Sequence, residues 1–255
     1  MREIDSLMRI GDVTVALSLL SRLPLTGLPV AHARGARAAW AYPLAGLVLG
    51  GMAGGAGMIA LHLGLPTALA ALIMLAALIA LTGAMHEDGL ADSVDGLWGG
   101  WTPARRLEIM KDSHIGTYGV IALILGLGAR WGALWALLDV GTGTAVTAVI
   151  VAAMLSRAVM PALMWALPHA RNDGLSHHVG RVPGQTVLAG VCVASGAALL
   201  LTGASAFVAL IVAGGVSLGI RAISRAKIGG QTGDILGATQ QITEIALLCT
   251  LLIQA

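Results

Sequence analysis

The chain has 255 residues, of which 57% are hydrophobic and only 11% are charged, and its formal net charge is +2 at pH 7. The mean hydropathy of +0.86 lies far above that of soluble globular domains, which excludes an ordinary water-soluble fold. So small a charge, without a basic stripe, also excludes a nucleic-acid partner.

Long apolar runs follow one another along the chain, and a helix needs about 20 such residues to cross about 30 Å of hydrocarbon. The runs lack the period-two alternation of a membrane barrel, whereas helices satisfy every backbone group within lipid. We therefore predict an all-α, polytopic transmembrane bundle that forms one integral-membrane domain over residues 1–255. The seven predicted spans are residues 40–63, 66–84, 115–138, 142–167, 186–201, 206–223 and 236–253.

Glycine is abundant, with 35 residues, and often recurs at small-xxx-small spacing. Gly46, Gly50 and Gly54 are one such series in the first span. Small residues at this spacing allow helix backbones to approach closely. The pattern predicts tight helix packing rather than catalysis.

Basic residues fall almost entirely in one of the two sets of connections between the spans. They gather in the N-terminal segment and in loops 85–114, 168–185 and 221–237, while the opposite turns at 62–66, 139–141 and 202–205 contain none. Lys and Arg favour the cytoplasmic side of a membrane. This predicts a multi-pass protein of the bacterial inner (cytoplasmic) membrane, with catalytic loops facing the cytoplasm and the C-terminus outside.

The densest polar cluster is HEDGLADSVDG, residues 86–96, directly after the second span. In a helix, Asp88, Asp92 and Asp95 stand at i, i+4 and i+7, within about 60° of one face. Such carboxylates repel one another unless a cation lies between them, and Mg²⁺ accepts one or two carboxylates together with phosphate oxygens. We predict that all three hold Mg²⁺. The alternative makes Asp88 a helix cap and Asp92 a first-turn charge, which explains two aspartates but not three.

The next motif is RRLEIMKDSHIGTYG, residues 105–119. Beside an acidic metal site, we expect Arg105 and Arg106 to bind substrate and Lys111 to neutralise phosphate. Asp112 is then a further ligand or the group that orients a nucleophile. Alone, the motif reads as a basic loop that flanks the membrane.

Two later loops complete the polar side. In RNDGLSHHVGRVPG, residues 171–184, we expect Arg171 to bind an anionic or large polar substrate. In GGQTGDILGATQQITE, residues 229–244, we expect Gln231, Thr232 and Asp234 to bind substrate, because glycine-rich turns let backbone N–H groups approach phosphate. The alternative is a flexible turn with Asp234 as a helix cap.

Three charged residues lie inside the predicted spans rather than in the loops: Arg130, Arg157 and Glu244. Charges within a bilayer are costly unless they are paired or face a cavity. They are interpreted either as groups on the substrate side or as a buried ion pair.

The motifs HEDGLADSVDG, MKDSHIGTYG and GGQTGDILGA, in this order and between membrane spans, resemble those of the cobalamin synthase family. LSRLPLTG and YPLAGLVLG extend the resemblance to nearly the whole chain. The family comprises the cobalamin-5′-phosphate synthases, also called adenosylcobinamide-GDP ribazoletransferases. Its histidine and three aspartates map onto His86, Asp88, Asp92 and Asp95, with Glu87 between the first two.

The resemblance implies an enzyme that uses Mg²⁺ to join adenosylcobinamide-GDP to α-ribazole or α-ribazole 5′-phosphate. The products are adenosylcobalamin or its 5′-phosphate, and GMP. A ribazole hydroxyl attacks the phosphorus attached to cobinamide, His86 or Asp112 takes the proton, and Lys111 stabilises charge on the phosphoryl group. The expected partners are these substrates and the lipid bilayer; the oligomeric state stays open, a homo-oligomer included.

Two other functions are also compatible with a polytopic membrane protein that carries clustered acidic residues. A phospholipid head-group phosphotransferase also combines membrane helices, aspartates and Mg²⁺, but its usual motif has Ala-Arg where this chain has Ala91-Asp92. A cation or proton-coupled transporter needs polar groups through the bilayer depth. Here the acidic residues cluster at one membrane surface, which favours the enzyme.

Overall fold

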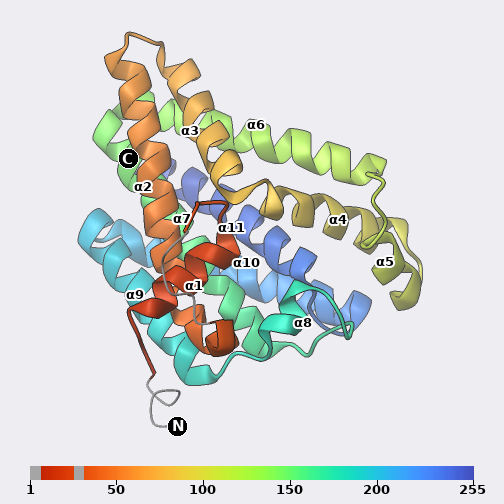
Figure 1. Cartoon of the computed structure of the whole chain (residues 1–255). Helices are drawn as coiled ribbons and strands as arrows, with labels where there is room; N and C mark the ends of the chain where they lie inside the picture. The colour runs from red at the N-terminus through yellow and green to blue at the C-terminus, as the bar shows by residue number, and fades with distance from the viewer. Residues whose placement is uncertain (1–6, 26–31) are drawn as a thin grey trace.

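The structure is a computed structural model that describes residues 7–25 and 32–255; residues 1–6 of the predicted cytoplasmic N-terminal segment lie outside this range. Within the described residues the chain is helical and has no β-strand (Figure 1). The helices are α1 Gly11–Leu20, η1 His32–Ala41, α2 Tyr42–His62, α3 Thr67–Thr82, α4 Met85–Gly99, α5 Pro103–Ile109, α6 Thr117–Val140, α7 Thr142–Ala166, α8 Leu175–Val179, α9 Gly184–Thr202, α10 Ser205–Ile228 and α11 Gly233–Ile253. The prediction of an all-α bundle is confirmed.

Six helices of the described chain are long and apolar enough to cross a bilayer, or seven if α3 and α4 together form one bent span. Each of the seven predicted spans corresponds to one of these elements. The second predicted span corresponds to α3, which is too short to count as a span by itself, and α4 follows it at an angle of 85°. Gly83 and Ala84 both have positive φ, 65° and 57°, and this left-handed pair ends α3 before the polar segment begins.

The prediction of a loop over residues 85–114 is wrong for most of that segment. Residues 85–99 form α4, and most of that helix is buried. Its main neighbours are α11 and α6, beside which it runs in Figure 1. The polar motif folds as a helix because its small and apolar residues pack against these two neighbours, while Asp88 and Asp92 lie on another face.

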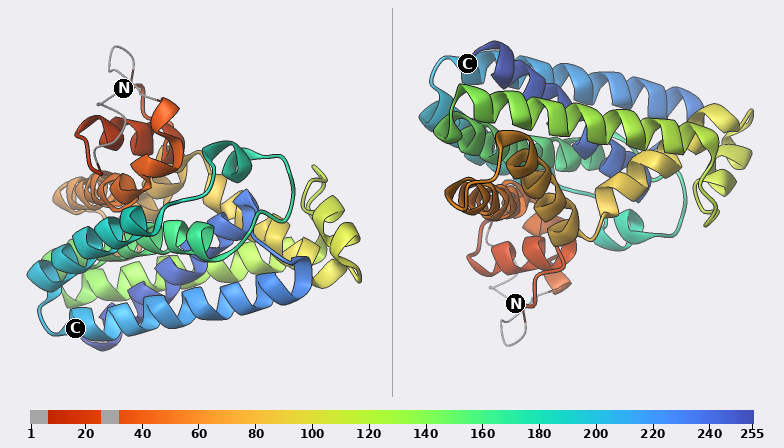
Figure 2. Two further views of the ribbon diagram at one scale, coloured as in Figure 1. Left: turned by 90° about the horizontal axis from the view of Figure 1, so that it is seen from below. Right: turned by 90° about the horizontal axis from the view of Figure 1, so that it is seen from above.

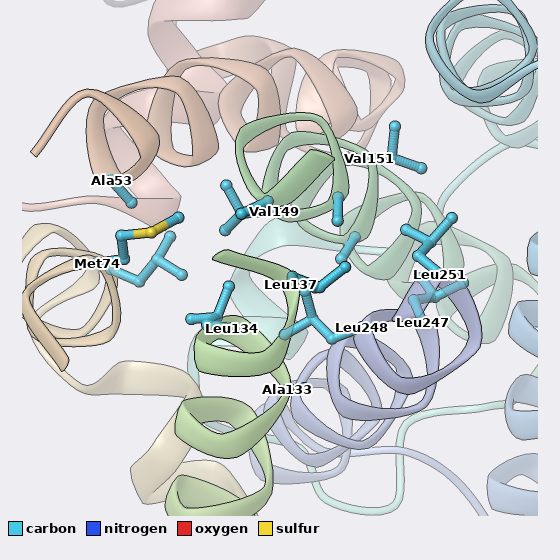
Figure 3. Close-up of a cluster of buried hydrophobic side chains, with 14 of the residues drawn as sticks. Ala53, Met74, Ala133, Leu134, Leu137, Val149, Val151, Leu247, Leu248 and Leu251 are labelled. Atoms are coloured by element: carbon cyan, nitrogen blue, oxygen red, sulfur yellow. The ribbon is translucent and has the colours of Figure 1, made fainter. Parts of the chain in front are cut away.

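Close helix packing through glycine is confirmed between α2 and α7. A Cβ added at Gly50 would lie 2.9 Å from the Cα of Ile150, and one added at Gly54 would lie 3.0 Å from a methyl group of Val146. Around this contact lies the main hydrophobic core, where Met74, Leu134, Val149 and Leu248 converge from four helices (Figure 3). The apolar core therefore fixes how the membrane helices cross.

The bundle has a polar end. α5, α8 and the turn between α10 and α11 lie towards one end of the long helices, whereas the C-terminus and the turn between α9 and α10 lie at the other (Figure 2). The α2–α3 hairpin is steeply inclined to α6 and α10 (Figure 1). Segments far apart in the sequence thus meet around α4.

Candidate active site

Two glycines set the position of α4 against α11. A Cβ added at Gly89 would lie 2.9 Å from the carbonyl oxygen of Asp234 and 3.2 Å from the Cα of Gly237. No larger residue fits there without moving one backbone, so the glycine inside α4 serves close approach. The contact places Asp88 beside the first turn of α11, which carries Asp234.

Asp88 and Asp92 form the acidic face of α4. Asp88 is exposed and Asp92 half-buried. The carboxylate of Asp92 experiences repulsion from Asp88, Asp234 and Asp95, and attraction from Arg171. Asp234, from α11, therefore adds its charge to those that act on Asp92.

Asp95 has a different environment. Its two carboxylate oxygens accept hydrogen bonds from the backbone N–H groups of Gly116 and Gly119, at 2.7 and 2.9 Å. A carboxylate in this place stabilises the N-terminus of α6. Among the described residues, no group of three or more His, Cys, Asp or Glu side chains is arranged to hold a metal ion. The predicted convergence of Asp88, Asp92 and Asp95 into one such group is therefore not found.

A chain of ion pairs joins three loops next to the aspartates. Lys111, before α6, pairs with Asp173, which lies 3.3 Å from Arg171; a second nitrogen of Arg171 lies 3.1 Å from Asp234. The hydrogen bond from Lys111 lowers the pKa of Asp173. The structure thus brings together Lys111, Arg171 and Asp234, as the sequence predicted for residues of one site.

Other predicted substrate-binding residues have bonds within the protein. Arg105 pairs with Glu108 on the surface of α5, and Arg106 donates to the carbonyl oxygens of Gly100 and Lys227, each at 2.9 Å. These bonds tie α5 to α4 and to the end of α10. Arg105 and Arg106 are therefore not gathered with Asp88 and Asp92.

Gln231 and Thr232 hold the turn before α11. The buried Gln231 side chain accepts from Ser176 at 2.6 Å and contacts a ring nitrogen of His169 at 2.9 Å. Thr232 caps α11 by accepting from Ile235 N–H at 3.3 Å. Gln231 thus ties the turn to the segment that carries Arg171, and the Thr232 hydroxyl also donates to Asp234 at 3.1 Å.

Sequence reasoning missed the role of Glu87. Its carboxylate accepts from the guanidinium of Arg130 at 2.7 Å, and Arg130 also pairs with Glu244 at 2.7 Å. Gln241 bonds both Arg130 and Glu87, and Arg157 lies 3.7 Å from Glu244. The two arginines and two glutamates are almost fully buried. The sequence predicts Arg130, Arg157 and Glu244 as charges inside the spans, but not Glu87. The signal for Glu87 is its position one residue before Asp88, because successive residues of a helix point about 100° apart.

His86 is also buried, at 1% exposure, and its Nε2 has no hydrogen-bond partner among the described residues. A buried polar atom without a partner costs free energy. His86 is also one of the residues that line an inner cavity.

Two cavities meet at Asp88. The inner cavity, of about 160 Å³, lies between α1, α2, α4, α7, α8 and α11 and is lined by both polar and apolar side chains, among them His86, Asp88, Arg171, Asp234, Met160 and Met164. The outer cavity, of about 540 Å³, lies between α4 and the segment before α6 and is lined by Asp88, Asp92, Lys111, Asp112 and His114 among others. An acidic helix flanked by cations, with a cavity on each side, suits a reaction between two phosphate-bearing or hydroxyl-bearing molecules.

Comparison with known proteins adds independent findings. Residues 12–252 match the protein family described as cobalamin-5-phosphate synthase. A protein of Bradyrhizobium diazoefficiens named adenosylcobinamide-GDP ribazoletransferase is 45% identical over 241 residues, which cover 94% of this chain and 92% of that protein. Proteins of the same name from Mesorhizobium japonicum and Brucella anthropi are each 42% identical, over 94% and 95% of this chain and 92% and 96% of their own lengths. No solved structure matches the chain.

Proposed function

The chain belongs to the cobalamin-5-phosphate synthase family, and from this premise we propose that it transfers the cobinamide phosphate of adenosylcobinamide-GDP to α-ribazole or α-ribazole 5′-phosphate. The new bond joins the ribazole hydroxyl oxygen to the phosphorus attached to cobinamide. The bond from that phosphorus to the bridging oxygen breaks, and GMP leaves with its electrons. Adenosylcobalamin, or its 5′-phosphate, is the other product.

The observation that carries the proposal is the meeting of Asp88, Asp92 and Lys111 on one cavity. Phosphoryl transfer is catalysed mainly by positioning and by charge that offsets the charge of the phosphoryl group. Lys111 supplies a positive charge at the outer cavity, and Arg171 supplies one at the inner cavity. We assign the hydroxyl proton to the unpartnered Nε2 of His86 at the inner cavity or to the carboxylate of Asp112 at the outer cavity.

The donor set fits Mg²⁺ in the form in which proteins usually bind it with nucleotides. Asp88 and Asp92 are one helical turn apart and line the same cavity, and Mg²⁺ commonly takes one or two carboxylates and completes its shell with water and phosphate oxygens. When bound there, the ion would offset the charge of the diphosphate.

The test is turnover by the purified protein in lipid nanodiscs with adenosylcobinamide-GDP, α-ribazole and Mg²⁺, followed by GMP release and by the new corrinoid product. We expect Asp92→Asn to lose at least about a hundredfold in kcat/KM, because charge stabilisation of this kind is worth that much. Asp139→Asn is the control, since among the described residues Asp139 accepts only from Thr67, and it belongs to α6 at its far end. Wild-type turnover by Asp92→Asn, or turnover of a CDP-alcohol and not of the corrinoid, contradicts the proposal.

For location, we infer the bacterial inner membrane with the α5 end in the cytoplasm. Support comes from the basic residues, which fall in the connections near α5, α8 and the end of α10, and are absent from the turns at 62–66, 139–141 and 202–205. A reporter that is active only outside the cytoplasm, fused after Ala255, is expected to be active. Activity of a cytoplasmic reporter there contradicts the orientation.

A further inference from the structure

The two cavities that meet at Asp88 differ in chemistry. Most of the inner cavity is lined by apolar side chains, including Leu20, Met160, Met164 and Leu236, and its charged groups are confined to the α4 and α11 side. The outer cavity has Asp92, Lys111, Asp112 and His114 in its lining. A ligand of the inner cavity therefore needs a flat or compact apolar part and a polar end, whereas a ligand of the outer cavity needs charge.

The two substrates differ in the same way. α-Ribazole has a flat, apolar dimethylbenzimidazole joined to a ribose. Adenosylcobinamide-GDP has a charged diphosphate and a corrin ring with its side chains, which is several times larger than a nucleobase. The inner cavity, at about 160 Å³, is smaller than the outer cavity, at about 540 Å³, and suits the smaller of the two groups.

Resting on the proposed function, we propose that the inner cavity binds the aromatic base of the ribazole substrate and that the outer cavity binds the diphosphate of the nucleotide-activated cobinamide. The base lies among Met160, Met164 and Leu20, because thioether sulfur and aliphatic groups make favourable contacts with an aromatic ring. The ribose lies at Asp88, where the cavities meet, so that its hydroxyl faces the diphosphate across α4.

Two residues that line the inner cavity carry buried polar atoms without a hydrogen-bond partner among the described residues. His86 is 1% exposed. Its Nε2 and Nη1 of Arg171 have no hydrogen-bond partner among the described residues. Both residues line the inner cavity. A ribose hydroxyl that donates to His86 Nε2, or a 5′-phosphate that accepts from Arg171 Nη1, would satisfy groups that the protein alone leaves unsatisfied.

The experiment separates the two substrates by their Michaelis constants. Met164→Ala widens the apolar end of the inner cavity, and losing part of a hydrophobic contact of this kind weakens recognition by about tenfold or more. We expect KM for α-ribazole to rise by that factor while KM for adenosylcobinamide-GDP changes by less than about twofold. Lys111→Gln is expected to show the opposite pattern, with the larger rise for adenosylcobinamide-GDP.

Met74→Ala is the matched control. Met74 is fully buried like Met164, but it belongs to the main core and contacts Gly57 rather than either cavity. Its substitution creates a comparable void without touching the site, so both KM values are expected to stay at the wild-type level. A general loss of packing would instead change Met74→Ala and Met164→Ala alike.

Equilibrium dialysis with α-ribazole alone completes the test, with Met164→Ala expected to bind it about tenfold more weakly than wild type. The inference is overturned if Met164→Ala raises KM for adenosylcobinamide-GDP instead, or if its α-ribazole binding is unchanged while a co-purified lipid is lost from the inner cavity. Either result, obtained with an active wild-type enzyme, leaves the proposed function standing. An inactive wild-type enzyme that nevertheless binds α-ribazole would overturn the proposed function and not the cavity.

Discussion

Arg130 on α6 and Glu87 on α4 form a buried ion pair at 2.7 Å, and Glu87 directly precedes Asp88 in the sequence. Successive residues of a helix point about 100° apart. Holding Glu87 against α6 therefore turns Asp88 and Asp92 towards the cavities. The ion pair therefore fixes the rotation of α4 about its own axis, and with it the direction of the candidate catalytic aspartates.

The first prediction concerns the ion pair between Arg130 and Glu87. Arg130→Met leaves Glu87 and Glu244 without their main partner, and breaking a buried pair from one side costs about 3–5 kcal/mol. We expect a loss of that size in the free energy of unfolding, measured by denaturant titration in detergent. The double substitution Arg130→Met with Glu244→Gln leaves one acid and one base and should recover part of the loss. Unchanged stability of the single variant would show that the pair contributes nothing.

The second prediction separates Asp95 from Asp92. Asp95→Asn removes the charge from the N-terminus of α6 and leaves one good acceptor for the two N–H groups, so it should cost about 0.5–2 kcal/mol of stability. The Mg²⁺ concentration for half-maximal turnover should stay as in wild type, whereas Asp92→Asn should raise it. A similar rise in both variants would make Asp95 a ligand as well as a cap.

The third prediction tests the contact between α4 and α11. In Gly89→Ala the new methyl group meets the Asp234 carbonyl at 2.9 Å, and overpacking of this kind costs about 1–3 kcal/mol. We expect lower thermal stability and lower turnover together. Gly128→Ala on α6 is the control, because a Cβ there has no neighbour within 4 Å, and replacing a helical glycine by alanine stabilises by up to about 1 kcal/mol. Equal effects of the two substitutions would argue against the close contact.

The fourth prediction concerns protonation at the outer cavity. The hydrogen bond between His114 and Asp112, at 2.6 Å, raises the pKa of His114 above its ordinary value, since the carboxylate favours the charged ring. In Asp112→Asn the pKa of His114 should fall towards that ordinary value. NMR titration of isotope-labelled histidine in nanodiscs checks this shift, and Glu108→Gln serves as a control that removes a nearby charge without a bond to His114. A pKa that does not move would exclude the interaction.

Much of the fold was predictable because apolar runs in a membrane have few structural options. Lipid requires each span to satisfy its own backbone, so run length alone located α2, α6, α7, α9, α10 and α11. The second span was harder. Gly83 and Ala84 end α3 early, and hydropathy does not report a change of direction, so the motif that follows was read as a loop.

The candidate site was predictable in its chemistry and less so in its arrangement. Spacing placed Asp88 and Asp92 on one face of a helix, which the structure confirms. It could not tell that Asp95 binds the backbone of Gly116 and Gly119, since a hydrogen bond to a distant segment leaves no mark in a local pattern. For the same reason Arg106 was expected at the substrate, although it bonds the end of α10.

By itself, the sequence determined that this protein is a helical membrane transferase, because hydrophobic length and motif order are properties of the linear chain. Only the tertiary structure decided that Glu87 belongs with Arg130, that Asp234 joins the aspartates of α4, and that two unlike cavities meet at Asp88. These relations depend on the crossing of α4 with α6 and α11. Such a crossing is set by packing between residues that are not neighbours in the sequence, such as Gly89 and Gly237.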